Sequence, residues 1–225
     1  MKTNAQAQIF SHILYFVAIC AALTLMSLPA HAQLAEVSLA SKTISLENRY
    51  PVPSVSEVFK DNILLTLAYM AGKQEKTKPV DWKEIEKPFS YAFSLKPGEI
   101  FAFQDSGLIP AYAQNVVKTT NAHYNGAEGF KSDGYLMGDG VCHLASLFYW
   151  AAKDAGIETV APVNHDFATI PEIDKKYGVA IYADPNNAAI SAQQNLYIRN
   201  NQAEPIMFRV VFNGKDLTVE VVKQI

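Results

Sequence analysis

The sequence predicts an α+β fold in a single domain, with a helix packed on a mainly antiparallel sheet. Three observations support this prediction. Apolar residues recur at helical spacing over residues 141–155, other segments alternate apolar and polar residues as half-buried strands do, and the tail carries a strong hairpin signal. Residues 56–225 contain all three features, so we expect them to form the domain.

The first 32 residues have the features of an export signal. Lys2 gives a weakly basic start, residues 13–28 are almost wholly apolar, and Ala30-His31-Ala32 provides the small-x-small pattern that signal peptidase recognises. We therefore expect a signal peptide over residues 1–32 and an exported, periplasmic or extracellular protein with no stable membrane span after cleavage. The alternative is an uncleaved anchor, because the apolar run is close to the minimum length for a transmembrane helix.

Residues 33–55 come next in the chain. They are polar, contain Pro51 and Pro53, and show no sustained hydrophobic period, so the sequence predicts an N-terminal arm. Apolar residues then follow helical spacing over residues 57–71, and Gly72 is a stop signal for that helix.

The strands are predicted from alternation and from turn residues. A turn over residues 96–99 leads into a short strand at 100–103. Further strands are expected at residues 157–163, 178–184, 206–212 and 217–222. Asn213-Gly214 is a strong signal for a two-residue turn between the last two strands, which predicts the C-terminal hairpin.

The composition is that of an ordinary globular chain. Charged residues make up 18% and hydrophobic residues 49% of the sequence, a balance that excludes a disordered or coiled-coil protein. A net charge of -3 argues against nucleic-acid binding, which needs a basic surface. Once the export segment is removed, Cys142 is the only cysteine, so no internal disulfide can form.

Cys142 is the most informative residue of this sequence. Asp139 is a good N-cap for the helix that follows, so Cys142 is expected in the first helical turn. Unpaired backbone N–H groups and the helix dipole lower the pKa of a thiol there, although the Asp139 carboxylate opposes that effect. A single cysteine in an apolar helix is also typical of a buried, inert thiol.

His165 follows the strand expected at 157–163, so the chain order is a cysteine, a helix, a strand and a histidine. Cysteine hydrolases and transglutaminase-like enzymes use this order, because an imidazole on a neighbouring strand can reach a thiol at a helix terminus. A third group usually orients the imidazole. Asp184 and Asn187, just past the next expected strand, are the candidates.

Six segments in matching order along the chain carry a family resemblance. The first is Asp61-Asn62-Ile63 with the helix around it, which resembles a helix of the family. Residues 138–152, which include Cys142, are similar to a glycine-rich GGGxCQxST motif, and residues 95–101 to a PGExF turn. The other three segments are residues 164–166, similar to NHS, residues 187–190, similar to DAxV, and residues 195–201, similar to DLxFxNN. These motifs are those of the VanW-like proteins, and the chain resembles that family from about residue 54 to residue 222.

The resemblance implies a bacterial cell-envelope setting, in a family whose biochemical activity is not established. This chain departs from the family motifs at several positions, which include Asp139, His143, Ala145 and Asn187. If the family's Cys-His pair is catalytic, Cys142 and His165 keep it. Asn187 stands where the family has an aspartate and can hold the imidazole only by hydrogen bonding, and Asp184 is its possible substitute.

The first functional hypothesis is a Cys-His hydrolase or acyl-transferase that acts on cell-wall or envelope peptides. Cys142 would attack an amide or ester carbonyl, and His165 would act as general base and then as general acid. Asp184 or Asn187 would orient the His165 ring. The N–H of Cys142 and a neighbour in the glycine loop would bind the oxyanion.

The second hypothesis is a non-catalytic envelope module that binds peptidoglycan or a protein partner through the glycine-rich loop. Gly138 and Gly140 would form the binding surface, and His143 would line the cleft or lie on the exposed flank of the helix. The changes at His143, Ala145 and Asn187 favour this hypothesis.

A metal site built from Cys142, His143, His165 and His123 is a third possibility, which the spacing disfavours. Structural zinc sites carry paired ligands at short spacing, and His143 points about 100° away from Cys142 on a helix. We therefore expect no metal and no cofactor, and we expect His123 at the surface.

Overall fold

The computed structural model describes residues 35–134 and 136–225. The signal peptide predicted over residues 1–32 therefore lies outside the described residues. Ala35–Ile225 forms one compact unit. Within the described ranges, the helices are all too short or too polar to cross a bilayer.

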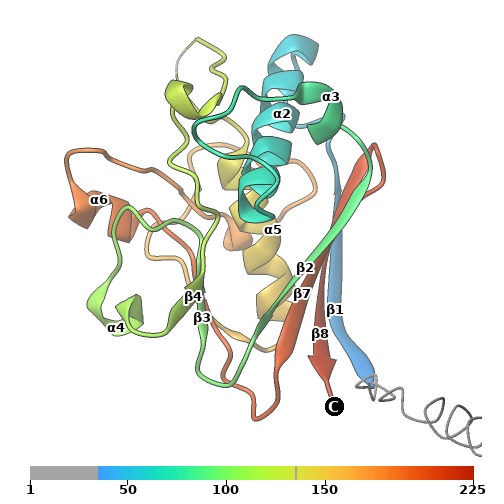
Figure 1. The fold of residues 1–225 in the computed structure, drawn as a ribbon, viewed down its shortest axis with the longest axis vertical. Helices are drawn as coiled ribbons and strands as arrows, with labels where there is room; N and C mark the ends of the chain where they lie inside the picture. Colours follow the sequence, from blue (N-terminus) through green and yellow to red (C-terminus); the bar gives the residue numbers. More distant parts are fainter. Residues whose placement is uncertain (1–34, 135) are drawn as a thin grey trace, which may run out of the picture. The chain divides into compact units, whose positions relative to one another are not determined.

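A four-stranded antiparallel sheet forms one side of this unit (Figure 1). Its strands lie in the order β1 (Glu36–Ser45), β8 (Asp216–Gln224), β7 (Ile206–Phe212) and β2 (Phe89–Leu95). The predicted C-terminal hairpin is confirmed as β7 and β8. Its loop is shifted by one residue: the Asn213 N–H donates to the Asp216 carbonyl at 3.1 Å, so Gly214 and Lys215 form the turn.

Strand β1 corrects the prediction of an N-terminal arm over residues 33–55. It pairs with β8 from Glu36 opposite Gln224 to Ser45 opposite Asp216. Most of its residues are at least partly exposed, as is usual for an edge strand, so its sequence shows no clear period. The strand is stabilised by backbone pairing with β8, which local periodicity cannot reveal.

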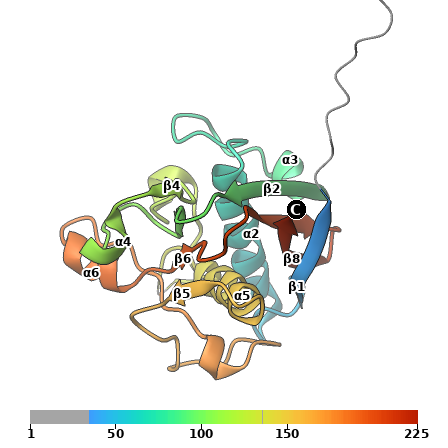
Figure 2. The same ribbon diagram turned by 90° about the horizontal axis from the view of Figure 1, so that it is seen from below.

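Two long helices lie between the four-stranded sheet and a smaller sheet (Figure 2). The first, α2 (Pro53–Met70), confirms the helix predicted at residues 57–71 and starts one turn earlier, at a proline that suits a first helical turn. The second, α5 (Val141–Asp154), packs against β1 and β8. The ring centroid of Phe148 in α5 lies 5.5 Å from that of Phe101 and 5.9 Å from that of Phe208, so aromatic rings fill the centre of the core.

The smaller sheet has the order β4 (Val116–Lys118), β3 (Ile100–Ala102), β6 (Tyr197–Arg199) and β5 (Glu158–Val160). Its β3–β4 pair is parallel and its other pairs are antiparallel. The α+β fold with mainly antiparallel sheets is thus confirmed. The strand predicted at 157–163 is shorter than expected, and the strand at 100–103 lacks its last residue.

The strand predicted at residues 178–184 is wrong, because that segment has no regular secondary structure. Its backbone N–H groups bond to scattered acceptors instead of a neighbouring strand. Ala180 donates to the carbonyl of Val163, and Tyr182 donates to that of Gln194. The apolar run of this segment is only partly buried: Val179 and Ala180 pack into the core, whereas Tyr182 is exposed.

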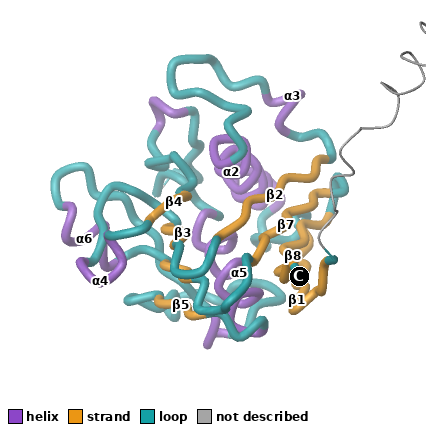
Figure 3. The backbone as a smooth tube through the Cα atoms, turned by 60° about the horizontal axis from the view of Figure 1, so that its bottom comes forward, coloured by secondary structure: helices purple, strands orange, loops and turns teal. Residues whose placement is uncertain are grey.

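The short helices are α3 (Trp82–Ile85), α4 (Pro110–Ala113), α6 (Ala188–Gln193), η1 (Gly126–Glu128) and η2 (Lys175–Tyr177). Figure 3 shows that α4, α6 and several long loops lie on the side of the two long helices away from the four-stranded sheet. Loops positioned by such a scaffold are where binding residues concentrate.

Candidate functional site: a pocket at the start of α5

The glycine-rich loop enters α5 through Gly140. Gly140 is the N-cap residue, with a left-handed backbone (φ 95°). A Cβ at this position would lie 2.5 Å from the carbonyl oxygen of Phe59 in α2, so only glycine fits. The prediction that Asp139 caps the helix is wrong: Asp139 precedes the cap, and its Oδ2 accepts a hydrogen bond from the N–H of Asp133 at 3.2 Å.

Asn62 of α2 fixes this loop against the helix, a role that sequence reasoning missed. Its Nδ2 donates to the carbonyl oxygens of Asp139 at 2.9 Å and Lys131 at 3.0 Å. Its Oδ1 accepts from the N–H of Lys131 at 2.8 Å. The side chain is fully buried, so these bonds hold the entry into α5 in one conformation.

Cys142 is the second residue of α5, and its sulfur lies against the backbone of Ile181. The thiol donates to the Ile181 carbonyl at 3.7 Å and accepts from the Ile181 N–H at 3.4 Å. Burial raises the pKa of the Cys142 thiol to about 11, and the nearby Asp139 carboxylate raises it further. The predicted lowering of this pKa is therefore wrong, because desolvation outweighs the favourable field at the helix start.

The Cys142 thiol is consequently expected to be slow to alkylate in the folded protein. At pH 7.5 a pKa of about 11 leaves roughly one thiol in 3000 ionised, compared with about one in ten for an ordinary cysteine. Labelling by iodoacetamide should be at least about 100-fold slower in the native protein than in guanidinium, as followed by intact mass. Equal rates in the two states would contradict the protonated thiol.

His165 and His143 lie together, with ring centroids 6.2 Å apart and the rings edge-on. Both side chains are buried, and burial lowers the pKa of both. The pKa of His143 falls to about 3, with the neighbouring Arg49 and His165 contributing. Cys142 and His165 both lie in the described part of the chain, and no hydrogen bond joins them there.

Asp184 and Asn187 make their side-chain hydrogen bonds locally and do not orient His165. Asn187 caps α6, where its Oδ1 accepts from the N–H groups of Ala189 at 3.1 Å and Ile190 at 3.2 Å. Asp184 Oδ1 accepts from the N–H of Asn186 at 2.8 Å. The Nδ1 atom of His165 has no hydrogen-bond partner among the described residues.

One pocket of about 550 Å³ brings several of the predicted site residues together. Its lining includes Cys142, His143, His165, Gly138 and Gly140 but neither Asp184 nor Asn187. Large exposed apolar side chains also line this pocket, and we call them the apolar rim: Tyr50, Leu136, Met137, Phe167 and Tyr182. Phe167 is 74% exposed, which is unusual for a side chain of this size unless the surface has a partner.

Arg49 lines the same pocket and was not predicted as a site residue. Its side chain is fully buried, with the guanidinium donating to Glu172 Oε2 at 3.1 Å and to the Pro171 carbonyl at 3.3 Å. Burial lowers the pKa of Arg49, and the Glu172 carboxylate opposes that shift. No sequence signal distinguished this arginine, since it lies in the segment that was predicted to be an arm.

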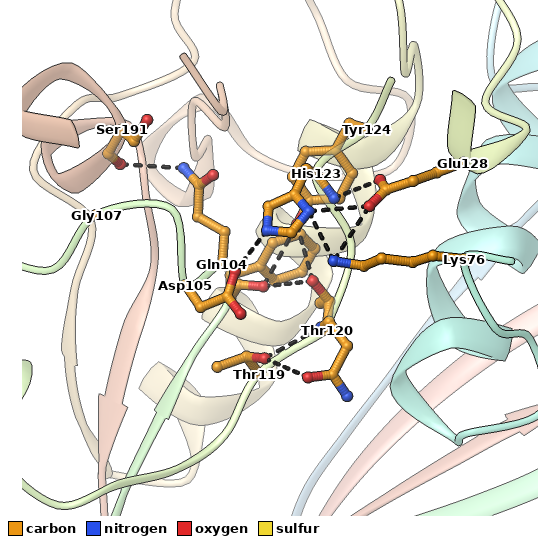
Figure 4. A network of polar contacts seen from close by, with 12 residues as sticks. Lys76, Gln104, Asp105, Gly107, Thr119, Thr120, His123, Tyr124, Glu128 and Ser191 are labelled. Atoms are coloured by element: carbon orange, nitrogen blue, oxygen red, sulfur yellow. Dashed lines mark hydrogen bonds and ion pairs between the residues drawn. The ribbon is translucent and has the colours of Figure 1, made fainter. Parts of the chain in front are cut away.

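His123, also in the pocket lining, is held between two carboxylates (Figure 4). Its Nδ1 lies 2.9 Å from Glu128 Oε1, and its Nε2 lies 2.9 Å from Asp105 Oδ1. Lys76 Nζ lies 3.4 Å from Glu128 Oε1 and 2.9 Å from His123 Nδ1. The His123 side chain is about one-third exposed and bonds to residues of three separate segments.

Within residues 35–134 and 136–225, no group of three or more His, Cys, Asp or Glu side chains has a metal-binding arrangement.

A family model described as VanW like protein matches residues 92–222 of the chain. The chain belongs to the VanW-like family. The matched segment of this VanW-like protein includes Cys142, His143 and His165, whereas Arg49 lies before it. No curated protein and no solved structure matches the chain.

Proposed function

We propose that this VanW-like protein is an exported, non-catalytic binding protein of the bacterial cell envelope, whose pocket holds part of a cell-wall peptide or an envelope protein. The pocket at the start of α5 carries the proposal. It combines a volume of about 550 Å³ with the apolar rim, as ligand sites commonly do. The thiol of Cys142, which lines the pocket, is hydrogen-bonded to the Ile181 backbone and protonated at neutral pH.

A Cys-His enzyme is the alternative, and the local geometry weighs against it. Such an enzyme needs a base within hydrogen-bond reach of the thiol and a third group that orients the base. The thiol of Cys142 instead bonds to Ile181, and Asp184 and Asn187 are engaged in local turns. Activation would require His165 to displace the Ile181 backbone from the sulfur.

Titration of the purified mature chain with soluble cell-wall stem peptides, followed by calorimetry and by mass spectrometry of the peptides, tests the proposal. Cys142→Ala should bind with unchanged affinity, since the thiol takes no part. Phe167→Ser should weaken binding about tenfold, because it removes most of an apolar contact from the rim. Val117→Ser is the matched control: Val117 is also exposed but does not line the pocket, so affinity should persist.

The first of two contrary outcomes would overturn the proposal, and the second would leave only an envelope protein as the ligand. Peptide cleavage or transfer by the wild type that disappears in Cys142→Ala would establish the enzyme instead. Absence of binding at millimolar peptide, with correct folding shown by circular dichroism, would exclude a cell-wall peptide as the ligand.

A further inference from the structure

The aromatic members of the apolar rim present accessible ring surface at the pocket. Tyr50, Phe167 and Tyr182 are 45%, 74% and 47% exposed, and all three line the pocket. Within residues 35–134 and 136–225, every other Phe, Tyr and Trp side chain is more buried than these three. A ligand in the pocket can therefore contact these rings directly, and the accessible aromatic surface of the described chain is gathered at this one place.

Buried rings hold two of these side chains in place. The ring centroid of Phe167 lies 4.0 Å from that of His165, and the ring centroid of Tyr50 lies 5.6 Å from that of Phe59. The Phe59 ring in turn lies 5.0 Å from the ring of His143. The two buried imidazoles support the exposed rings and make no contact with a ligand themselves. Rings that packing already fixes lose little conformational freedom on binding.

Asp139 supplies a charged group to the same pocket. It lines the pocket and is partly exposed, and the next residue, Gly140, lies against the backbone of Phe59. Its Oδ2 accepts a hydrogen bond from the N–H of Asp133 at 3.2 Å, and a carboxylate can accept several more. The pKa of this carboxyl group is about 6, so most molecules carry the charge at neutral pH. The pocket thus has a negative charge beside its aromatic rings.

These features together indicate which ligand group the pocket suits. The faces of aromatic rings carry partial negative charge and attract ammonium groups, and the Asp139 carboxylate attracts them as well. Arg49 and His123, which also line the pocket, are already paired with carboxylates. The Arg49 side chain is fully buried, and its guanidinium bonds to Glu172 Oε2 at 3.1 Å. The accessible surface therefore favours a cation over an anion.

We propose that the pocket binds the side-chain ammonium group of a diamino acid in a cell-wall peptide, with Asp139 as its ion-pair partner and the aromatic rings of the apolar rim around it. This inference rests on the proposed function and adds the chemical group that is recognised. The methylene stem of such a side chain is apolar and suits Leu136 and Met137, the other members of the rim. The rim and the carboxylate thus select the same kind of side chain.

The test compares two forms of one soluble stem peptide that contains lysine, with its ε-amino group free or acetylated. Calorimetry gives the ratio of the two affinities. The wild type should bind the free amine about tenfold more tightly, because acetylation removes both the ion pair and the cation–π contact. Asp139→Asn should lower this ratio about threefold, since asparagine still accepts from the N–H of Asp133 but has no charge. Phe167→Leu should also lower it about threefold, since leucine is apolar but has no ring face.

Asp166→Asn is the matched control, because Asp166 is an exposed carboxylate next to His165 that does not line the pocket. It should keep the affinity ratio of the wild type. Butylammonium and butyrate, which have the same number of carbon atoms and opposite charges, are further probes. Butylammonium should shift the ring NMR signals of Phe167 and Tyr182 at lower concentration than butyrate does. If Asp139→Asn does not fold, Phe167→Leu and this pair of probes decide.

The outcomes separate this inference from the proposed function. Equal binding of the free and acetylated peptides by the wild type would overturn ammonium recognition and leave peptide binding intact. An unchanged ratio in folded Asp139→Asn, or a response to butyrate at the lower concentration, would overturn it in the same way. Failure of both peptide forms to bind would overturn this inference and leave an envelope protein as the only ligand of the proposed function.

Discussion

Replacing Gly140 with alanine is expected to destabilise the folded chain by about 3 kcal/mol. A left-handed backbone at a non-glycine residue costs about 1 kcal/mol, and forcing an extra methyl group into packed structure costs about 1–3 kcal/mol more. The new Cβ would lie 2.5 Å from the oxygen and 2.8 Å from the Cα of Phe59. Both are backbone atoms of α2, which cannot move aside as a flexible side chain would.

Alanine substitutions at two other glycines distinguish the cost of the left-handed backbone from the cost of the steric overlap with α2. Gly72 and Gly156 also have positive φ angles, of 69° and 71°, but nothing lies within 4 Å of a Cβ built on either. Gly72→Ala and Gly156→Ala should therefore lose only about 1 kcal/mol. Urea unfolding followed by circular dichroism measures all three, and a loss in Gly140→Ala no greater than in Gly156→Ala would show that α2 and the loop do not meet closely.

The elements that sequence reasoning predicted correctly are those with strong local signals. Helix α5 and the β7–β8 hairpin follow from helical spacing and from turn residues, both of which depend on near neighbours. Strand β1 was missed because it depends on β8, which lies far along the chain: Thr43 pairs with Thr218, 175 residues later. The strand predicted at 178–184 is wrong because a short apolar run that is buried without regular structure has the same sequence pattern as a buried strand.

The candidate site divides in the same way. Cys142, His143 and His165, which the sequence analysis singled out from their order along the chain, all line one pocket. The pKa of the Cys142 thiol depends on Ile181 and on desolvation, both set by tertiary packing that the order of residues does not show. Arg49 joins the pocket lining from a segment without any motif, so only the folded structure could identify it.

His143 is expected to make the folded chain sensitive to acid. Its pKa is about 6.5 when unfolded and about 3 when folded, so between these values the unfolded chain binds a proton that the folded chain does not. The contribution of His143 to the free energy of unfolding is therefore fully present above pH 6.5 and decreases as the pH falls below that value. Since one pKa unit corresponds to about 1.4 kcal/mol, the loss between pH 7 and pH 5 is about 2 kcal/mol.

Other groups in the pocket titrate over the same range. Burial lowers the pKa of His165, which adds to the loss on acidification. Burial raises the pKa of Asp139 from 3.8 to about 6, so the folded chain gains a proton there before the unfolded chain does, and stability rises on acidification. The two effects partly cancel in the wild type, and its overall pH profile cannot isolate His143.

A comparison with His143→Gln removes this cancellation, because glutamine keeps a buried polar group but does not titrate. Between pH 7 and pH 5, the free energy of unfolding of the variant should rise relative to that of the wild type by about 2 kcal/mol. Urea unfolding at pH 7, 6 and 5 measures this difference, and Asp139 contributes equally to both proteins. Parallel profiles would mean that His143 takes up a proton in the folded state as readily as in the unfolded state.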